Sequence, residues 1–216
     1  QMDGRTSLVA QAAEIAVSRG ILVINAAGNE GMTPWRIIAT PGDAEHVVAV
    51  GALSIPAAGE PSIAPFSSVG PTADGRIKPD VAAPGVEVNL PVVGTTGQYM
   101  VSSGTSLAAP LIAGLCALLL EARPDWTPAM VMEALKLSAR DLGPAGPDNT
   151  YGWGLPNGLA ALNASPVAVA GYSQNRNDSL PAPFSAGIPY PNPFNPELTV
   201  PFRLSSPERV TISVFD

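Results

Sequence analysis

Residues 6–28 read TSLVAQAAEIAVSRGILVINAAG and combine the two patterns that decide the fold. In the first part, apolar side chains recur at helical spacing, and Gly20 then ends a predicted helix over residues 6–19. The second part, residues 21–28, is a continuous apolar run rich in branched side chains, which indicates a strand buried on both faces. A helix that leads directly into such a strand is typical of an α/β domain with a mostly parallel sheet.

The alternation of strands and helices continues further along the chain. Residues 107–120 are apolar all round, which predicts a helix buried on every side, with Pro110 tolerated because it lies near the first turn. An amphipathic helix is expected next, with Thr127 as its N-cap and Pro128 at the first helical position. Further strands are expected within residues 46–53, 63–68 and 79–88.

The composition excludes several classes of protein. The net charge is -7 and no basic cluster is visible, which argues against nucleic acid as a partner. The apolar run at residues 107–120 is too short to cross a bilayer, so no transmembrane segment is predicted. The only cysteine, Cys116, lies in that run and is interpreted as a small buried hydrophobe, not as a catalytic thiol.

The character of the sequence changes after Leu162. Residues 163–189 are rich in Asn, Ser, Pro and Gly and have little periodicity, which predicts a linker. From residue 198 onward, apolar and polar residues alternate as they do in half-buried antiparallel strands. We therefore expect an α/β domain over residues 1–162, a linker over 163–189, and the start of a small β domain over 190–216.

Ser106 is the strongest candidate for chemistry. It lies in residues 103–110, SGTSLAAP, directly before the apolar helix. At that place a backbone N–H has no partner inside the helix, and the helix dipole favours negative charge. These features suit a nucleophile that generates an oxyanion, although a lone serine at this position is more often a simple helix cap.

Asn29 is the second candidate. It follows the predicted strand at residues 21–28, and ligands of open α/β sheets bind outside the carboxyl ends of strands. Its side-chain amide offers a hydrogen-bond donor there, although a Gly-Asn pair taken alone is explained better by a turn. Residues 66–72, FSSVGPT, and 78–85, KPDVAAPG, show no catalytic chemistry and are interpreted as loop architecture.

Four segments together, in this order, resemble the subtilisin-like serine proteases, or subtilases: AAGNEG, FSSVGPT, KPDVAAPG and GTSLAAP. The resemblance covers about residues 1–162. It implies a three-layer α/β fold and hydrolysis of peptide bonds by a Ser-His-Asp mechanism. The family commonly has methionine and histidine where this chain has Leu107 and Leu111, neither of which is a catalytic position. An α/β-hydrolase is disfavoured because Ser106 does not lie in a Gly-x-Ser-x-Gly elbow.

The resemblance also implies roles for individual residues. Ser106 would be the nucleophile, and the Asn29 side chain and the Ser106 N–H would form the oxyanion hole, with Thr105 as support at longer range. No cofactor is required for this chemistry. The family often binds structural calcium, but no carboxylate cluster here has the spacing of a calcium loop, so no metal site is assigned.

A specificity pocket is implied as well. Ala26, Ala27 and Gly28 would form one wall, Ala39 would form the base, and Thr40 would lie beside a cis proline. A small residue at the base leaves room, so the polypeptide substrate is expected to carry a large apolar side chain before the scissile bond.

The catalytic acid and base are not apparent in this chain. Asp3, His46 and Ser106 follow the acid, base, nucleophile order that subtilisins use. We reject this triad because the family's histidine precedes the Asn29 segment, and we interpret the chain's only histidine as a strand-end residue. The Asp and His motifs are expected upstream of Gln1, so the 216-residue chain is expected to be an inactive fragment that folds poorly.

Residues 190–196, YPNPFNP, and the alternating segments after them resemble the start of bacterial C-terminal sorting domains. This implies that secretion machinery recognises the C-terminal region and that the protein is extracellular or on the bacterial cell surface. A proline-rich linker into an unrelated β-sandwich stays open as an alternative. The alternative for the whole protein is a subtilase-like domain that has lost catalysis and serves as a binding or surface module.

Overall fold

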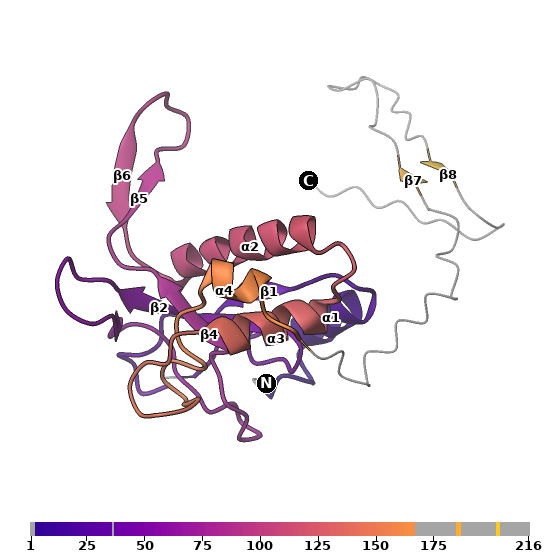
Figure 1. Ribbon diagram of the computed structural model, residues 1–216, viewed down its shortest axis with the longest axis horizontal. Coiled ribbons are helices and arrows are strands. Elements are labelled where there is room, and N and C mark those ends of the chain that lie inside the picture. Colours follow the sequence, from indigo (N-terminus) through magenta and orange to yellow (C-terminus); the bar gives the residue numbers. More distant parts are fainter. Residues whose placement is uncertain (1–2, 36, 167–184, 187–201, 204–216) are drawn as a thin grey trace, which may run out of the picture. The chain divides into compact units, whose positions relative to one another are not determined.

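The computed structural model describes residues 3–35, 37–166, 185–186 and 202–203. Contacts divide the chain into two units, Gln1–Tyr172 and Ser173–Asp216. The described elements of the first unit (Figure 1) are α1 (Leu8–Ser18), β1 (Ile24–Ala26), β2 (Val48–Ser54), β3 (Ser62–Ile63), β4 (Val81–Pro84), β5 (Val88–Pro91), β6 (Tyr99–Ser102), α2 (Thr105–Ala122), α3 (Pro128–Ser138) and α4 (Gly158–Leu162).

The sheet is built around β2, whose side chains are almost all buried. Strands β1 and β4 both run parallel to β2, with Ile24 opposite Val48 and Val50 opposite Val81. Strand β3 is antiparallel and pairs only with the carboxyl end of β2. The prediction of a mostly parallel sheet is therefore confirmed. Separately, β5 and β6 form an antiparallel hairpin that projects from the body of this unit (Figure 1).

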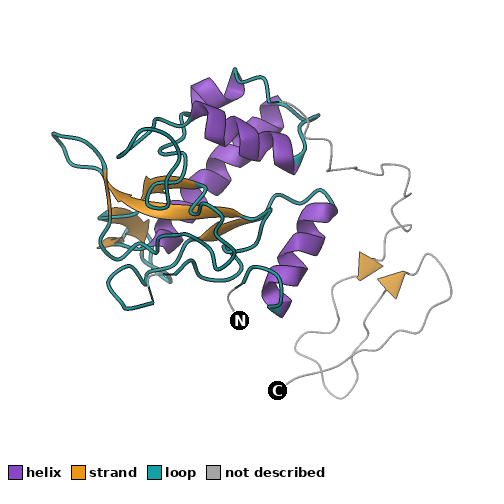
Figure 2. Cartoon of the chain, turned by 90° about the horizontal axis from the view of Figure 1, so that it is seen from below, coloured by secondary structure: helices purple, strands orange, loops and turns teal. Residues whose placement is uncertain are grey.

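Helices cover both faces of the sheet (Figure 2). On one face, alternate residues of β2 such as Val48 and Val50 pack in a cluster with buried residues of α2 and α3. On the other face, Val47 packs with Ala10 and Ala13 of α1. This gives the three layers implied by the resemblance, because a strand presents successive side chains to opposite faces.

Local sequence signals set the helix ends. Helix α1 ends at Ser18, and Gly20 follows with a positive φ of 83°, a backbone conformation that glycine adopts without steric cost. Helix α3 begins at Pro128, and the Thr127 side chain accepts a hydrogen bond from Met130 N at 3.3 Å. The predicted stop and the predicted N-cap are both confirmed.

The prediction that the apolar helix is buried on every side is wrong for the described part of the chain. Helix α2 buries the face that carries Ile112 and Cys116, whereas Leu111 and Leu118 are 47% and 64% exposed. It also begins two residues earlier than expected, so Pro110 lies inside the helix and not in its first turn. An all-apolar sequence does not show which neighbours are present, and only one face of α2 meets the sheet.

Helix α2 is also longer than the apolar run at residues 107–120. With 18 residues, it is long and apolar enough to cross a membrane by length and composition alone. That is weak evidence for a span, since a core helix passes the same test, and one face of α2 packs in the cluster on the sheet.

The second unit contains strands β7 (Ser185–Ala186) and β8 (Phe202–Arg203), which pair antiparallel. Strand β7 lies within the segment predicted as a linker, and β8 lies within the first predicted strand of the tail. The YPNPFNP segment lies outside the described residues, as does most of the tail on which the sorting-domain resemblance depends.

Candidate active site

Ser106 is the second residue of α2, directly after β6 and a short Ser103-Gly104 link. The residue is exposed, whereas Gly104 and Thr105 before it are buried. Gly104 N donates to Gly85 O at 2.8 Å, which fixes the link to the turn after β4. Position two of a helix leaves the Ser106 N–H without an intrahelical acceptor, at the positive end of the helix dipole.

Thr105 orients the side chain of Asn29 from the neighbouring loop. Asn29 Oδ1 accepts hydrogen bonds from Thr105 N at 3.0 Å and from Thr105 Oγ1 at 2.9 Å. Since both donors engage the oxygen, the amide has one orientation, and its Nδ2 donor is left for another partner. Thr105 therefore contacts Asn29 directly and orients its amide.

The Ser106 hydroxyl and two N–H donors lie around one small space next to Gly104. A Cβ placed on Gly104 would lie 3.1 Å from Ser106 Oγ, 3.7 Å from Asn29 Nδ2 and 3.9 Å from Ser106 N. The absence of a side chain at this glycine keeps the space open. Two N–H donors that converge beside a serine hydroxyl are the arrangement needed to stabilise the oxyanion of acyl transfer.

The residues expected to form the specificity pocket also lie together. Ala39 N donates to Ala27 O at 2.7 Å, and a Cβ placed on Gly28 would lie 3.0 Å from the Ala39 Cβ. The Thr40–Pro41 peptide bond is cis, and Ala26 forms the last residue of β1, directly before these groups. The wall and the base that the resemblance implies are therefore neighbours beside the Asn29 loop.

Two segments that were interpreted as loop architecture support the site. In KPDVAAPG, Gly85 receives the hydrogen bond from Gly104 N, and a side chain on Gly85 would come within 2.7 Å of the Ala52 Cβ. In FSSVGPT, Phe66 O accepts from Gly31 N at 2.9 Å and so holds the end of the Asn29 loop. These contacts use backbone atoms, so no side-chain pattern could have revealed them.

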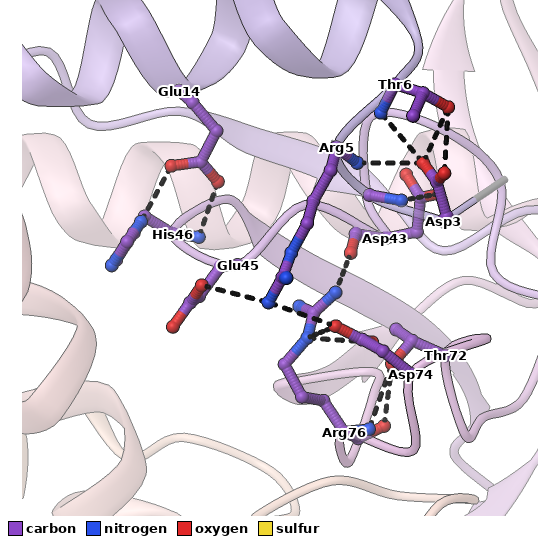
Figure 3. A network of polar contacts seen from close by, with 11 residues as sticks. Asp3, Arg5, Thr6, Glu14, Asp43, Glu45, His46, Thr72, Asp74 and Arg76 are labelled. Atoms are coloured by element: carbon purple, nitrogen blue, oxygen red, sulfur yellow. Dashed lines mark hydrogen bonds and ion pairs between the residues drawn. The ribbon is translucent and has the colours of Figure 1, made fainter. Parts of the chain in front are cut away.

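His46 lies at the other edge of the sheet. It precedes the amino end of β2, whereas Asn29 follows the carboxyl end of β1, and these strands are parallel. Its Nδ1 lies 2.6 Å from Glu14 Oε2, and its backbone N donates to Glu14 Oε1 at 2.8 Å (Figure 3). The structure thus places this histidine away from the loops that carry Ser106 and Asn29.

Asp3 is engaged elsewhere too. Its carboxylate accepts from the backbone N–H groups of Thr6 and Arg5 and from the Thr6 hydroxyl (Figure 3). These hydrogen bonds, those of Thr6 first, lower the pKa of Asp3 to about 2. Asp3, His46 and Ser106 do not form a triad in this structure.

The remaining candidates for chemistry are inert or absent in the described part of the chain. Burial raises the pKa of the Cys116 thiol to about 12, which disfavours a reactive thiolate. Among the described residues, no group of three or more His, Cys, Asp or Glu side chains could hold a metal ion.

Comparisons with known proteins identify the family to which this chain is similar. The Subtilase family, Peptidase_S8, matches residues 1–154. The serine protease AprX of Bacillus subtilis is 41% identical over 162 residues, which cover 68% of this chain and 36% of AprX. Subtilisin from Bacillus pumilus is 40% identical over 147 residues, which cover 68% of this chain and 48% of that protein.

A solved structure is similar as well. Fervidolysin from Fervidobacterium pennivorans, described as a keratinolytic enzyme related to subtilisin, matches with a TM-score of 0.61 and 29% identity, covering 73% of this chain and 25% of fervidolysin. The chain thus spans less than half the length of each of these relatives. With a family match over most of its length and a serine and two donors converging at the start of α2, this chain belongs to the subtilase family of serine peptidases.

Proposed function

We propose that the complete protein containing this chain is a secreted serine endopeptidase that uses Ser106 as its nucleophile in a Ser-His-Asp mechanism. The observation that carries the proposal is the single open space surrounded by Ser106 Oγ, Ser106 N and Asn29 Nδ2. Family membership and proteolytic relatives support the same reaction class.

The reaction follows from this geometry. Ser106 Oγ attacks the carbonyl carbon of the peptide bond while its proton passes to a histidine base, which an aspartate orients. The carbonyl oxygen becomes an oxyanion and accepts hydrogen bonds from Asn29 Nδ2 and Ser106 N. The histidine then gives its proton to the leaving amine, and a water molecule hydrolyses the acyl-enzyme. Thr105 keeps the Asn29 amide in the orientation that this step needs.

We further propose that the histidine and aspartate belong to a part of the protein outside these 216 residues. His46 is held by Glu14 at the wrong edge of the sheet. Helices α1 and α2 expose several large apolar side chains: Leu8, Val9, Ile15, Leu111 and Leu118. Large exposed apolar areas mark surfaces that another protein segment covers, and we propose that a further part of the same domain covers these side chains. The chain alone is then an inactive fragment.

The decisive test is labelling with a fluorophosphonate, which reacts with activated serines. The complete protein is expected to be labelled on the peptide that contains Ser106, because base and oxyanion hole are then both present. The isolated chain is expected to stay unlabelled, because it lacks the base. Labelling of the isolated chain would contradict the proposed division. A folded complete protein that resists labelling would favour the alternative, a non-catalytic binding or surface module.

The small residues next to Asn29 support a preference for a large apolar side chain before the scissile bond. Ala27 and Ala39 are small and apolar, and Gly28 adds no side chain. Peptides with Phe or Leu at this position are expected to exceed the Ala peptide in kcat/KM by at least about tenfold, since each methylene buried in an apolar pocket adds to the stabilisation of the transition state. Replacing Ala39 by Phe should fill the pocket and reverse the order. Wild-type preference for small or acidic residues would refute this assignment.

Location and partners follow from the same proposal. Polypeptides are the substrates, and no cofactor takes part in the chemistry; structural calcium is compatible with the family but is assigned to no residue. Bacterial subtilases among the relatives and the resemblance of residues 190–216 to sorting domains support an extracellular or cell-surface location. In that case the C-terminal region is the part recognised by secretion machinery.

A further inference from the structure

Ser68 holds the loop of Asn29 from both sides. Its backbone N donates to Gly28 O at 2.8 Å, and its Oγ accepts from Glu30 N at 3.1 Å. The residues immediately before and after Asn29 are thus fixed by one serine, which is fully buried with 0% exposure. No other described residue bonds to the backbone on both sides of Asn29.

This loop has few other restraints. Strand β1 ends at Ala26, and the last hydrogen bond that continues its pairing with β2 runs from Ala27 N to Val50 O at 2.9 Å. Beyond that point, the loop backbone is held by Ala39 N at Ala27 O, by Thr105 Oγ1 at Gly28 N, and by residues 66–68. Gly28 lies against Ser68 so closely that an added Cβ would come within 2.7 Å of the Ser68 Oγ.

We propose that Ser68 is a positioning residue for the oxyanion hole, acting on catalysis through Asn29. The inference rests on the proposed function. An oxyanion donor is effective only at about 2.7–3.1 Å from the developing charge, and a misplacement of about 1 Å can lower the rate about a hundredfold. Thr105 orients the Asn29 amide and also accepts a hydrogen bond from Gly28 N at 3.3 Å, whereas Ser68 bonds to the backbone on both sides of Asn29.

Ser67 provides a matched control. It is equally buried, with 1% exposure, and lies next to Ser68 in the chain. Its Oγ accepts from Ala52 N of β2 at 3.1 Å and donates to Ser68 O at 3.4 Å, and neither of these two hydrogen bonds involves the Asn29 loop. Loss of either hydroxyl removes a buried hydrogen bond of similar kind, but only Ser68 supports the position of Asn29.

The test is a double-mutant cycle in the complete protein, measuring kcat, KM and Tm. Ser68→Ala is expected to lower kcat about 10- to 100-fold with little change in KM, and Asn29→Ala about 100- to 1000-fold. The Ser68→Ala/Asn29→Ala double variant should be no slower than Asn29→Ala, because Ser68 has no catalytic effect once the amide is gone. The losses from Ser67→Ala and Asn29→Ala should instead multiply.

Two results would overturn the inference. One is a folded Ser68→Ala protein with wild-type kcat. The other is a Ser68→Ala loss that multiplies with the Asn29→Ala loss, as general structural damage would. If Ser68→Ala does not fold, Ser68→Cys takes its place, because its thiol is a much weaker acceptor for Glu30 N than the hydroxyl. Its kcat is then expected to fall by less than the Ser68→Ala value, and an unchanged kcat or a loss that multiplies with that of Asn29→Ala would overturn the inference. A folded wild type without turnover or labelling overturns the proposed function together with this inference, whereas an active wild type with either result above overturns the inference alone.

Discussion

Replacing Ser106 by alanine in the complete protein is expected to lower kcat by about a millionfold, a magnitude measured on a subtilisin itself. The Ser106 hydroxyl lies at the space next to Gly104, and without it no acyl-enzyme forms. KM should change little, because the Ser106 side chain adds little to ground-state binding. The measurement is steady-state hydrolysis of a peptide substrate, together with loss of fluorophosphonate labelling.

Asn29→Ala gives an informative comparison in the same assay. It leaves the nucleophile in place, so labelling should persist at a reduced rate and kcat should fall only about 100- to 1000-fold, again the magnitude found for a subtilisin. Ser18→Ala, which removes an exposed hydroxyl from α1, is the control for serine loss as such and should match the wild type. Retention of more than about 1% of turnover in Ser106→Ala would point to a different nucleophile.

Replacing Lys78 by methionine is expected to reduce the free energy of unfolding by about 3–5 kcal/mol. Lys78 and Asp80 are both almost fully buried, and their Nζ and Oδ2 atoms lie 2.6 Å apart. Lys78 Nζ also donates to Val47 O, and Asp80 Oδ2 accepts from Ala49 N, so the pair clamps the amino end of β2. Burial lowers the pKa of Lys78, and the Asp80 carboxylate opposes this shift.

Urea denaturation of the complete protein, followed by tryptophan fluorescence in the Ser106→Ala background to prevent self-digestion, measures this effect. Lys136→Met is the matched control: Lys136 lies 3.3 Å from Asp80 Oδ1 but is partly exposed, so its loss should cost about 1 kcal/mol or less. The Lys78→Met/Asp80→Asn double variant should be more stable than Lys78→Met alone, because no uncompensated charge stays buried. If Lys78→Met lowered the free energy of unfolding by less than about 1 kcal/mol, the proposed stabilisation of β2 by the Lys78–Asp80 pair would be wrong.

The resemblance to subtilases implied that Ser106 and Asn29 belong to one site, whereas each residue taken alone was explained as well by a helix cap or a turn. Asn29 follows a strand, and Ser106 lies at the start of a helix. In an α/β domain such positions gather at the carboxyl edge of the sheet, and the structure brings the two residues to adjacent loops through Thr105. The same topology explains why His46, which precedes the amino end of β2, lies at the opposite end of these parallel strands from Asn29.

The supporting residues could not be predicted in this way. Ser68 and Gly85 act on backbone atoms from segments far away in the chain, and such contacts leave no periodic pattern. The segment that contains Lys78 was interpreted as loop architecture, and lysine is almost never fully buried unless it is paired. Its partner Asp80 lies two residues away, but only the fold shows that both side chains point into the interior.

The sequence by itself determined the α/β class and the main helices and strands of the sheet domain, because hydrophobic periodicity and capping residues act locally. The segments proposed to carry the nucleophile and the amide donor were found through their resemblance to subtilase motifs. Only the tertiary structure decided which face of α2 is buried, which residues hold the Asn29 loop in place, and that His46 is bound to Glu14. These depend on contacts between segments distant in the chain, whose formation is governed by packing and hydrogen-bond satisfaction in the folded state and not by local preference.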